Sequence, residues 1–255
     1  MEKKARMRSN ADQKRMSNEI VCLRSLLKDS YPEALDALSN EELAGLAPLI
    51  HPRRYSPEIF DKCFKEYLMM MTSAYRRDEK RVKLAYKEYS SLFFELSSAI
   101  KSIERTLNQL EELMDLRLGK YAVAYENLSV RVYGVLLSFL IRCLGLTAQR
   151  SGVHGSVEDV HKAIAMLKEH RDVKNLLDSI DTFLLNVFAD GFYYTWRGLI
   201  TLIGKDPITG KVRKKRVGED YIEDKLMKLL ACSVSMILSL AVFYLTRVRA
   251  KPSTS

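Results

Sequence analysis

The strongest constraint on the fold of this 255-residue chain is a run of apolar residues spaced alternately four and three positions apart. Its members are Val82, Tyr86, Tyr89, Phe93, Leu96, Ile100, Ile103, Leu107, Leu110 and Met114. This heptad spacing places all of them along one side of an α-helix. No Gly or Pro interrupts residues 58–118, and Ser56-Pro57 is a favourable helix start. The pattern therefore predicts one long helix over about 57–118.

The apolar side of that helix, residues 82–114, needs something to pack against. Its spacing does not distinguish a helix of this chain from a helix of another molecule. We therefore expect burial against an internal helix, a helical protein partner or a second copy of the chain.

The scarcity of turn residues, with 11 Gly and 6 Pro, favours helix in the rest of the chain too. Ser39 with Glu42, and Ser156 with Asp159, predict the starts of two shorter helices. The predicted fold class is all-α, a helical bundle with one long heptad-patterned helix. The expected organisation is a disordered basic arm (1–16), short helices (17–56), the long coiled-coil-like helix and an apolar helix (57–148), a helical segment (149–204), a basic turn or hairpin (205–220), and a C-terminal apolar helix with a basic tail (221–255).

The C-terminal helix contains the most apolar stretch, Leu229–Thr246, which has eighteen residues and no charge. Eighteen residues is the lower edge of what crosses a bilayer core of about 30 Å. Basic residues on both sides, Lys225, Lys228, Arg247, Arg249 and Lys251, suit the two head-group layers. The stretch predicts a membrane-spanning helix, and the alternative is a helix buried in a bundle. Residues 132–146 are a weaker candidate, because Arg142 lies inside them.

A cluster of cations precedes this stretch: Lys211, Arg213, Lys214, Lys215 and Arg216. The chain as a whole has a formal charge of +9, which favours polyanionic partners. We expect the cluster to contact anionic lipid if the helix spans a membrane, or nucleic-acid phosphate if it does not. Aromatic residues do not alternate with these cations along the sequence, which disfavours single-strand binding.

Catalytic, cofactor and metal sites are not predicted. The sequence has none of the phosphate-binding, dinucleotide-binding, nucleophile-elbow or zinc-protease motifs. Glu158 and His161 can share a helix face, but two ligands do not make a metal site. The basic, polar N-terminus lacks the apolar stretch of a secretory signal. If the C-terminal helix spans a membrane, the cation cluster before it should face the cytoplasm, so we expect the N-terminal body to be cytoplasmic.

Residues 56–68 (SPEIFDKCFKEYL) and 110–125 (LEELMDLRLGKYAVAY) resemble the helical domain of archaeal GINS replication subunits. In that family, a helix opening near a phenylalanine or tyrosine precedes a second helix with an L-R-x-x-K pattern, here Leu116 to Lys120. The small β domain of the family has no clear counterpart in this sequence. The resemblance implies a subunit of a DNA-replication assembly.

Two functions are therefore expected as alternatives. The first is a non-enzymatic, membrane-anchored interaction or scaffolding protein with a cytoplasmic helical body. The second is a basic helical subunit of a nucleic-acid assembly in the cytoplasm.

Overall fold

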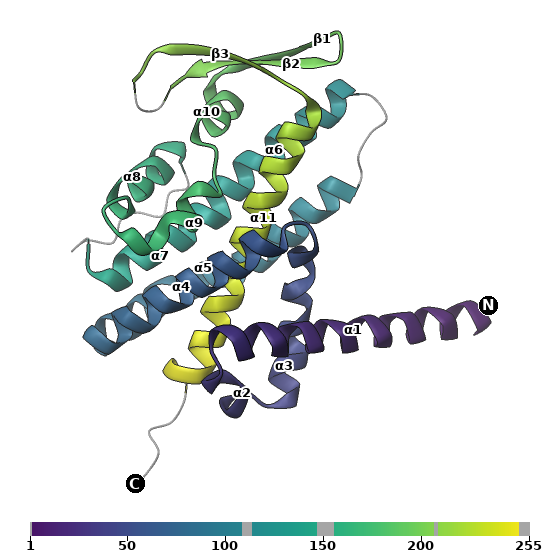
Figure 1. Ribbon diagram of the computed structural model, residues 1–255, viewed down its shortest axis with the longest axis vertical. Helices are drawn as coiled ribbons and strands as arrows, with labels where there is room; N and C mark the ends of the chain where they lie inside the picture. Colours follow the sequence, from purple (N-terminus) through teal and green to yellow (C-terminus); the bar gives the residue numbers. More distant parts are fainter. Residues whose placement is uncertain (1, 109–113, 147–155, 207–208, 250–255) are drawn as a thin grey trace.

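The computed structural model describes residues 2–108, 114–146, 156–206 and 209–249 (Figure 1). It is 79% helical and carries a small three-stranded sheet, so the all-α prediction is right for the bundle and wrong for the sheet. The α-helices are α1 (Glu2–Ser30), α2 (Glu33–Ala37), α3 (Asn40–Leu46), α4 (Pro57–Arg77), α5 (Glu79–Asn108), α6 (Met114–Asn127), α7 (Gly134–Leu144), α8 (Val157–Leu167), α9 (Lys174–Asp178), α10 (Thr182–Asp190) and α11 (Glu219–Phe243). Shorter 3₁₀ or π segments are η1 (Ala47–Arg54), η2 (Leu128–Tyr133), η3 (Arg171–Val173) and η4 (Tyr244–Val248).

The predicted single helix over 57–118 is wrong, because the chain turns back at Asp78. This residue leaves the helical conformation, with φ −153° and ψ 83°. Its carboxylate accepts a hydrogen bond from the backbone N–H of Arg81, at 2.9 Å. Aspartate is among the preferred N-cap residues, so α5 begins anew after it. Helices α4 and α5 then lie side by side as a helical hairpin (Figure 1).

The heptad side of α5 is buried, as predicted, and helices of the same chain cover it. The buried members are Val82, Tyr86, Tyr89, Leu96, Ile100 and Ile103. They pack toward α4, α6, η2 and α7, and Phe93 is partly buried beside them. The side chains of Leu107, Leu110 and Met114 lie outside the described part. Over Val82–Ile103 the packing partner is therefore internal.

The N-terminal arm, predicted as disordered over 1–16, is helical from Glu2 onward as part of α1. The physical reason is propensity: Lys, Arg, Met, Ala and Glu favour helix, and neither Gly nor Pro occurs before Pro32. Helix α1 packs on the rest of the molecule through the buried side chains Leu23, Leu26 and Leu27. Its first half points away from the rest of the molecule (Figure 1).

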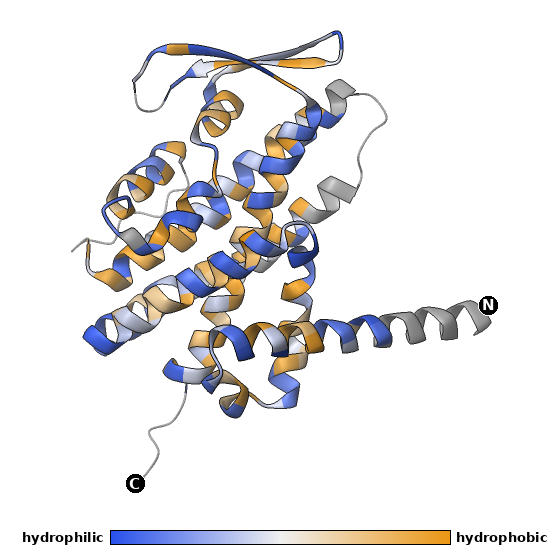
Figure 2. Cartoon of the chain, in the orientation of Figure 1, coloured by the Kyte–Doolittle hydropathy of each residue, from blue (hydrophilic) through white to orange (hydrophobic). Residues whose placement is uncertain are grey.

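Helix α11 runs through the middle of the bundle, with α4, η1, α6 and η2 around it. In Figure 2 much of its ribbon has the colour of hydrophobic residues, and it lies between helices that also carry hydrophilic residues. Its bonds to neighbouring helices include two buried ones: Tyr86 Oη donates to the Leu240 carbonyl at 3.0 Å, and Ser239 Oγ donates to the Phe64 carbonyl at 2.9 Å. Such bonds satisfy polar groups that burial would otherwise penalise.

Two helical stretches are long and apolar enough to cross a membrane: Arg117–Leu144, with a mean hydropathy of 1.4, and Glu219–Val248, with 2.1. Their apolar windows are 72% and 78% buried inside the molecule. Core helices of a bundle have the same composition, so hydropathy alone does not separate the two environments. Arg142, within the first stretch, forms a two-point ion pair with Glu88 of α5, at 2.9 and 3.0 Å.

The helical segment predicted over 149–204 is wrong at its end, where the strands β1 (Phe192–Trp196) and β2 (Leu199–Lys205) lie. The turn between them consists of Arg197 and Gly198, whose φ angles of 51° and 75° are both positive. That combination is the two-residue turn that suits the twist of a hairpin. Aromatic and β-branched residues on either side favour strand. Strand β3 (Val212–Val217) completes the predicted basic hairpin, giving an antiparallel sheet in the order β1-β2-β3.

The sheet lies at the end of the molecule where α11 begins, against α10 (Figure 1). Close approach is possible because Gly191 has no side chain. A Cβ there would lie 2.7 Å from the carbonyl oxygen of Ile203 and from the Cα of Val187. The backbone of the sheet can therefore sit directly on α10.

Candidate functional site

The sheet has two faces with different chemistry, because successive side chains of a strand point to opposite sides. The antiparallel register assigns each residue to one face. The inner face consists of Tyr193, Thr195, Ile200, Leu202, Gly204, Arg213, Lys215 and Val217. The outer face consists of Phe192, Tyr194, Trp196, Leu199, Thr201, Ile203, Lys205, Val212, Lys214 and Arg216.

The inner face attaches the sheet to the bundle. Ile200 and Leu202 are fully buried. The ring of Tyr193 contacts the ring of Phe188 of α10 edge-on, with centroids 5.5 Å apart. These contacts fix the orientation of the sheet, so the outer face points away from the bundle.

The outer face exposes large apolar side chains. Phe192 is 61% exposed, Trp196 66% and Leu199 47%, while Tyr194 is 36% exposed. Single exposed apolar residues are common on protein surfaces, but a contiguous group of them marks an interaction site. Three of these four residues are aromatic and follow one another along the outward side of β1.

The register also brings cations onto this face. Phe192 pairs with Ile203, which in turn pairs with Lys214. Two residues further along β1, Tyr194 pairs with Thr201, which in turn pairs with Arg216. A row of aromatic rings on β1 therefore runs parallel to a row of cations on β3, with one strand between them.

Contacts across the face tie these rows together. A hydrogen bond with Thr201, and the positive charges of Lys214 and Arg216, hold the pKa of Tyr194 below its usual value. Thr201 is only 2% exposed although it belongs to the outer face. At the end of β1, the guanidinium of Arg197 lies over the ring of Trp196, 5.7 Å from its centroid. Cations and rings on this face are thus direct neighbours.

The five predicted cations are not brought together as one patch. Lys214 and Arg216 lie on the outer face and are exposed. Lys211 is exposed in the turn between β2 and β3. Arg213 and Lys215 belong to the inner face, where they serve the fold.

The two inward cations have partners in the bundle. Lys215 Nζ donates to the hydroxyl of Tyr221 at 2.6 Å, and that hydroxyl donates to the carboxylate of Asp181. Arg213 pairs with Asp206 at 3.7 Å and lies over the ring of Phe183. Both side chains therefore contact groups on the inner side of the sheet, which leaves Lys214 and Arg216 as the β3 cations that share a face with the exposed rings.

The aromatic half of the site was not predicted, because Phe192–Trp196 was assigned to a helical segment. Aromatic residues do not alternate with the cations along the sequence, but strand pairing brings rings and cations about twenty positions apart onto one face. A signal was present in the sequence: FYYTW and LITLI are runs of strand-favouring residues, and only Arg197 and Gly198 separate them.

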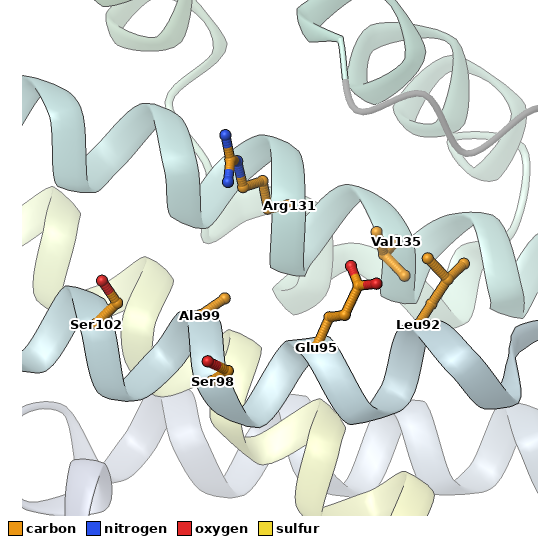
Figure 3. A pocket seen from close by; sticks show the side chains of 7 residues that line it. All are labelled: Leu92, Glu95, Ser98, Ala99, Ser102, Arg131 and Val135. Atoms are coloured by element: carbon orange, nitrogen blue, oxygen red, sulfur yellow. The ribbon is translucent and has the colours of Figure 1, made fainter.

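Apart from the sheet, a hollow of about 600 Å³ lies between α5 and the η2–α7 helix (Figure 3). Small side chains on α5, among them Ser98 and Ala99, leave this space open. Glu95 projects from one wall and Arg131 from the other (Figure 3). The groove offers one carboxylate and one guanidinium, whereas the sheet offers a repeated arrangement of rings and cations. We therefore take the sheet as the candidate site.

In the described part of the chain, no group of three or more His, Cys, Asp or Glu side chains lies close enough to hold a metal ion. His161 Nε2 lies 2.7 Å from Asn186 Oδ1, and Glu158 pairs with Lys162. Glu158 and His161 therefore each have a separate partner.

Comparisons with protein-family models, with curated proteins and with solved structures found no match to this chain.

Proposed function

We propose that this protein is a non-enzymatic nucleic-acid-binding protein that contacts its ligand through the outer face of the sheet. The observation that carries the proposal is the register of β1, β2 and β3, which aligns exposed rings with Lys214 and Arg216. Cations contact phosphate, and aromatic rings contact bases, so the two rows together suit a nucleic acid better than either does alone. The net charge of +9 adds a long-range attraction.

The resemblance of residues 56–68 and 110–125 to the helical domain of GINS subunits points toward the same class of partner. The first stretch lies in α4, and the described part of the second lies in α6. In this proposal the bundle holds the sheet, α11 is its core, and the protein works in the cytoplasm as part of a nucleic-acid assembly.

The test is the salt dependence of binding to labelled single-stranded and duplex oligonucleotides, measured by fluorescence anisotropy. Binding should weaken steeply as salt rises, because cations displace counterions from phosphates. The double variant Lys214→Gln/Arg216→Gln should lower the slope of log affinity against log salt by roughly 1.4 for a single strand. The matched control removes two exposed charges from the bundle, Lys65→Gln/Lys80→Gln, and should leave the slope nearly unchanged. If neither oligonucleotide binds at low salt, the proposal is refuted.

A second function, membrane anchoring through Leu229–Thr246, is favoured by one observation: Glu219–Val248 has a mean hydropathy of 2.1. The protein would then be an interaction or scaffolding module with its N-terminal body in the cytoplasm and its basic cluster on anionic lipid. For this, α11 would have to leave the bundle. Contacts at its end oppose that, since Arg247 bonds Tyr31 and Arg249 pairs with Glu42 at 3.1 Å.

Cell fractionation separates the two functions. A spanning helix keeps the full chain in membranes washed with high salt and carbonate, whereas lipid contact through cations alone is released by salt. A chain that ends at Tyr221 gives the second readout. If α11 is core, this truncation removes the centre of the bundle and the protein becomes insoluble. If α11 is an anchor, the truncated body stays soluble.

A further inference from the structure

We infer that the ligand of the outer face is single-stranded nucleic acid, with bases stacked on Phe192, Tyr194 and Trp196. This inference rests on the proposed function and specifies the form of nucleic acid that the site binds. The inference is based on the geometry of the aromatic row. Phosphate contacts alone would need the cations but not a row of exposed rings.

The three rings are evenly spaced along β1. Outward side chains on one strand recur at every second residue, about 6.7 Å apart. Phe192 and Tyr194 have ring centroids 5.8 Å apart and planes tilted by 43°, so neither ring covers the face of the other. Every base has a flat π-face, and each ring can therefore accept one unstacked base.

The distance from the rings of β1 to the cations of β3 matches the distance from base to phosphate in a nucleotide. Strand β3 lies two strand spacings from β1, about 10 Å away. With a base on Phe192 or Tyr194, the sugar lies over β2, where the residues level with these rings, Ile203 and Thr201, are uncharged. The phosphate then reaches the row that carries Lys214 and Arg216.

A duplex does not fit this arrangement. Its bases are paired and stacked inside the helix, where rings on a flat sheet cannot reach their faces. A membrane surface fits less well, because interfacial aromatics and head-group cations lie at different depths in a bilayer. Here the rings and the cations rise from the same face of one sheet.

Binding is expected to show little sequence preference. Stacking does not read the hydrogen-bonding edges of bases. The two hydroxyls near the centre of the face, of Tyr194 and Thr201, already bond each other. The site is therefore suited to three consecutive bases of any identity.

The experiment uses the full chain, a fluorescein-labelled mixed-sequence single strand and the matching duplex. Trp196 is the only tryptophan in the chain, so its fluorescence reports stacking directly. Single strand should quench it and duplex should not. Phe192→Ala and Trp196→Ala should each weaken single-strand binding by roughly 5- to 150-fold. Neither should change the salt slope, because no cation is lost.

The matched control is Val212→Ala, which truncates a 72% exposed apolar residue of the same face that has no ring. Its effect should stay under about twofold, since surface changes away from such contacts are small. Circular dichroism of each variant verifies that the sheet and bundle are intact.

The outcomes separate this inference from the proposed function. If single strand and duplex bind equally, Trp196 is not quenched and the ring variants bind normally, the inference is wrong while phosphate binding stands. If no oligonucleotide binds, both are wrong. If vesicles containing phosphatidylserine shift Trp196 emission and oligonucleotides do not, the face binds lipid and the inference is wrong.

Discussion

Helix α11 and strand β1 both carry large apolar side chains, but the fold treats them in opposite ways. Phe243 of α11 is fully buried, whereas Phe192 of β1 is 61% exposed. The apolar surface of α11 is therefore accounted for by packing inside the chain. The apolar surface of β1 is not covered in this way, because Trp196, at the other end of the strand from Phe192, is exposed as well. The more hydrophobic segment, α11, therefore belongs to the core, while the less hydrophobic one, β1, is the better candidate for binding a ligand.

The largest expected effect comes from truncating the same residue type in the two regions. Phe243→Ala should lower the free energy of unfolding by about 3–5 kcal/mol, because it opens a cavity among the rings of Tyr75 and Tyr86. Phe192→Ala should change it by no more than about 0.5 kcal/mol. Chemical denaturation followed by circular dichroism measures both. Equal destabilisation by the two variants would show that Phe192 is part of the core, and the contrast between α11 and β1 would be wrong.

A smaller effect is expected at alkaline pH, where tyrosines of the two regions differ. Burial raises the pKa of Tyr67 and of Tyr86 well above the usual value. Their contribution to stability is fully present below about pH 10 and is lost as the pH rises above it, because only the unfolded chain then ionises. The loss amounts to at most about 1.4 kcal/mol per pH unit for each tyrosine. Urea denaturation midpoints across this pH range measure it.

Tyr194 should behave oppositely, because the hydrogen bond with Thr201 lowers its pKa. In a titration of tyrosinate absorbance it should ionise before the buried tyrosines. Tyr194→Phe should remove the earliest part of the curve, and Tyr86→Phe should leave that part unchanged. An unaltered early phase in Tyr194→Phe would mean that this hydroxyl does not contact Thr201 and Lys214.

The smallest effect concerns two glycines. Gly198 has a φ of +75°, so Gly198→Ala should strain the β1–β2 turn and cost about 1 kcal/mol. Gly119 lies within α6, and a Cβ there meets nothing within 4 Å. Gly119→Ala should therefore stabilise the protein by about 0.5–1 kcal/mol. Thermal melting of the two variants should shift in opposite directions. A neutral Gly198→Ala would mean that the turn does not hold the aromatic row in place.

Local signals in the sequence were sufficient for much of the bundle. The heptad spacing identified the buried side of α5, and Ser39 with Glu42 and Ser156 with Asp159 form the capping boxes that begin α3 and α8. These features depend on residues within one or two helical turns of each other, so the sequence displays them directly. The turn at Asp78 is local as well, but the absence of Gly and Pro from residues 58–118 concealed it.

The candidate site depended on contacts that no local pattern contains. The five cations of residues 211–216 are adjacent in sequence, yet strand alternation directs Lys215 inward to Tyr221 and Lys214 outward. Pairing through β2 then sets Phe192 level with Lys214, more than twenty residues later. Sequence by itself determined the buried side of α5, the starts of α3 and α8, and which segments are apolar or basic. Tertiary structure alone decided which helix encloses which and which charges meet which rings, because packing and strand register join residues that are distant along the chain.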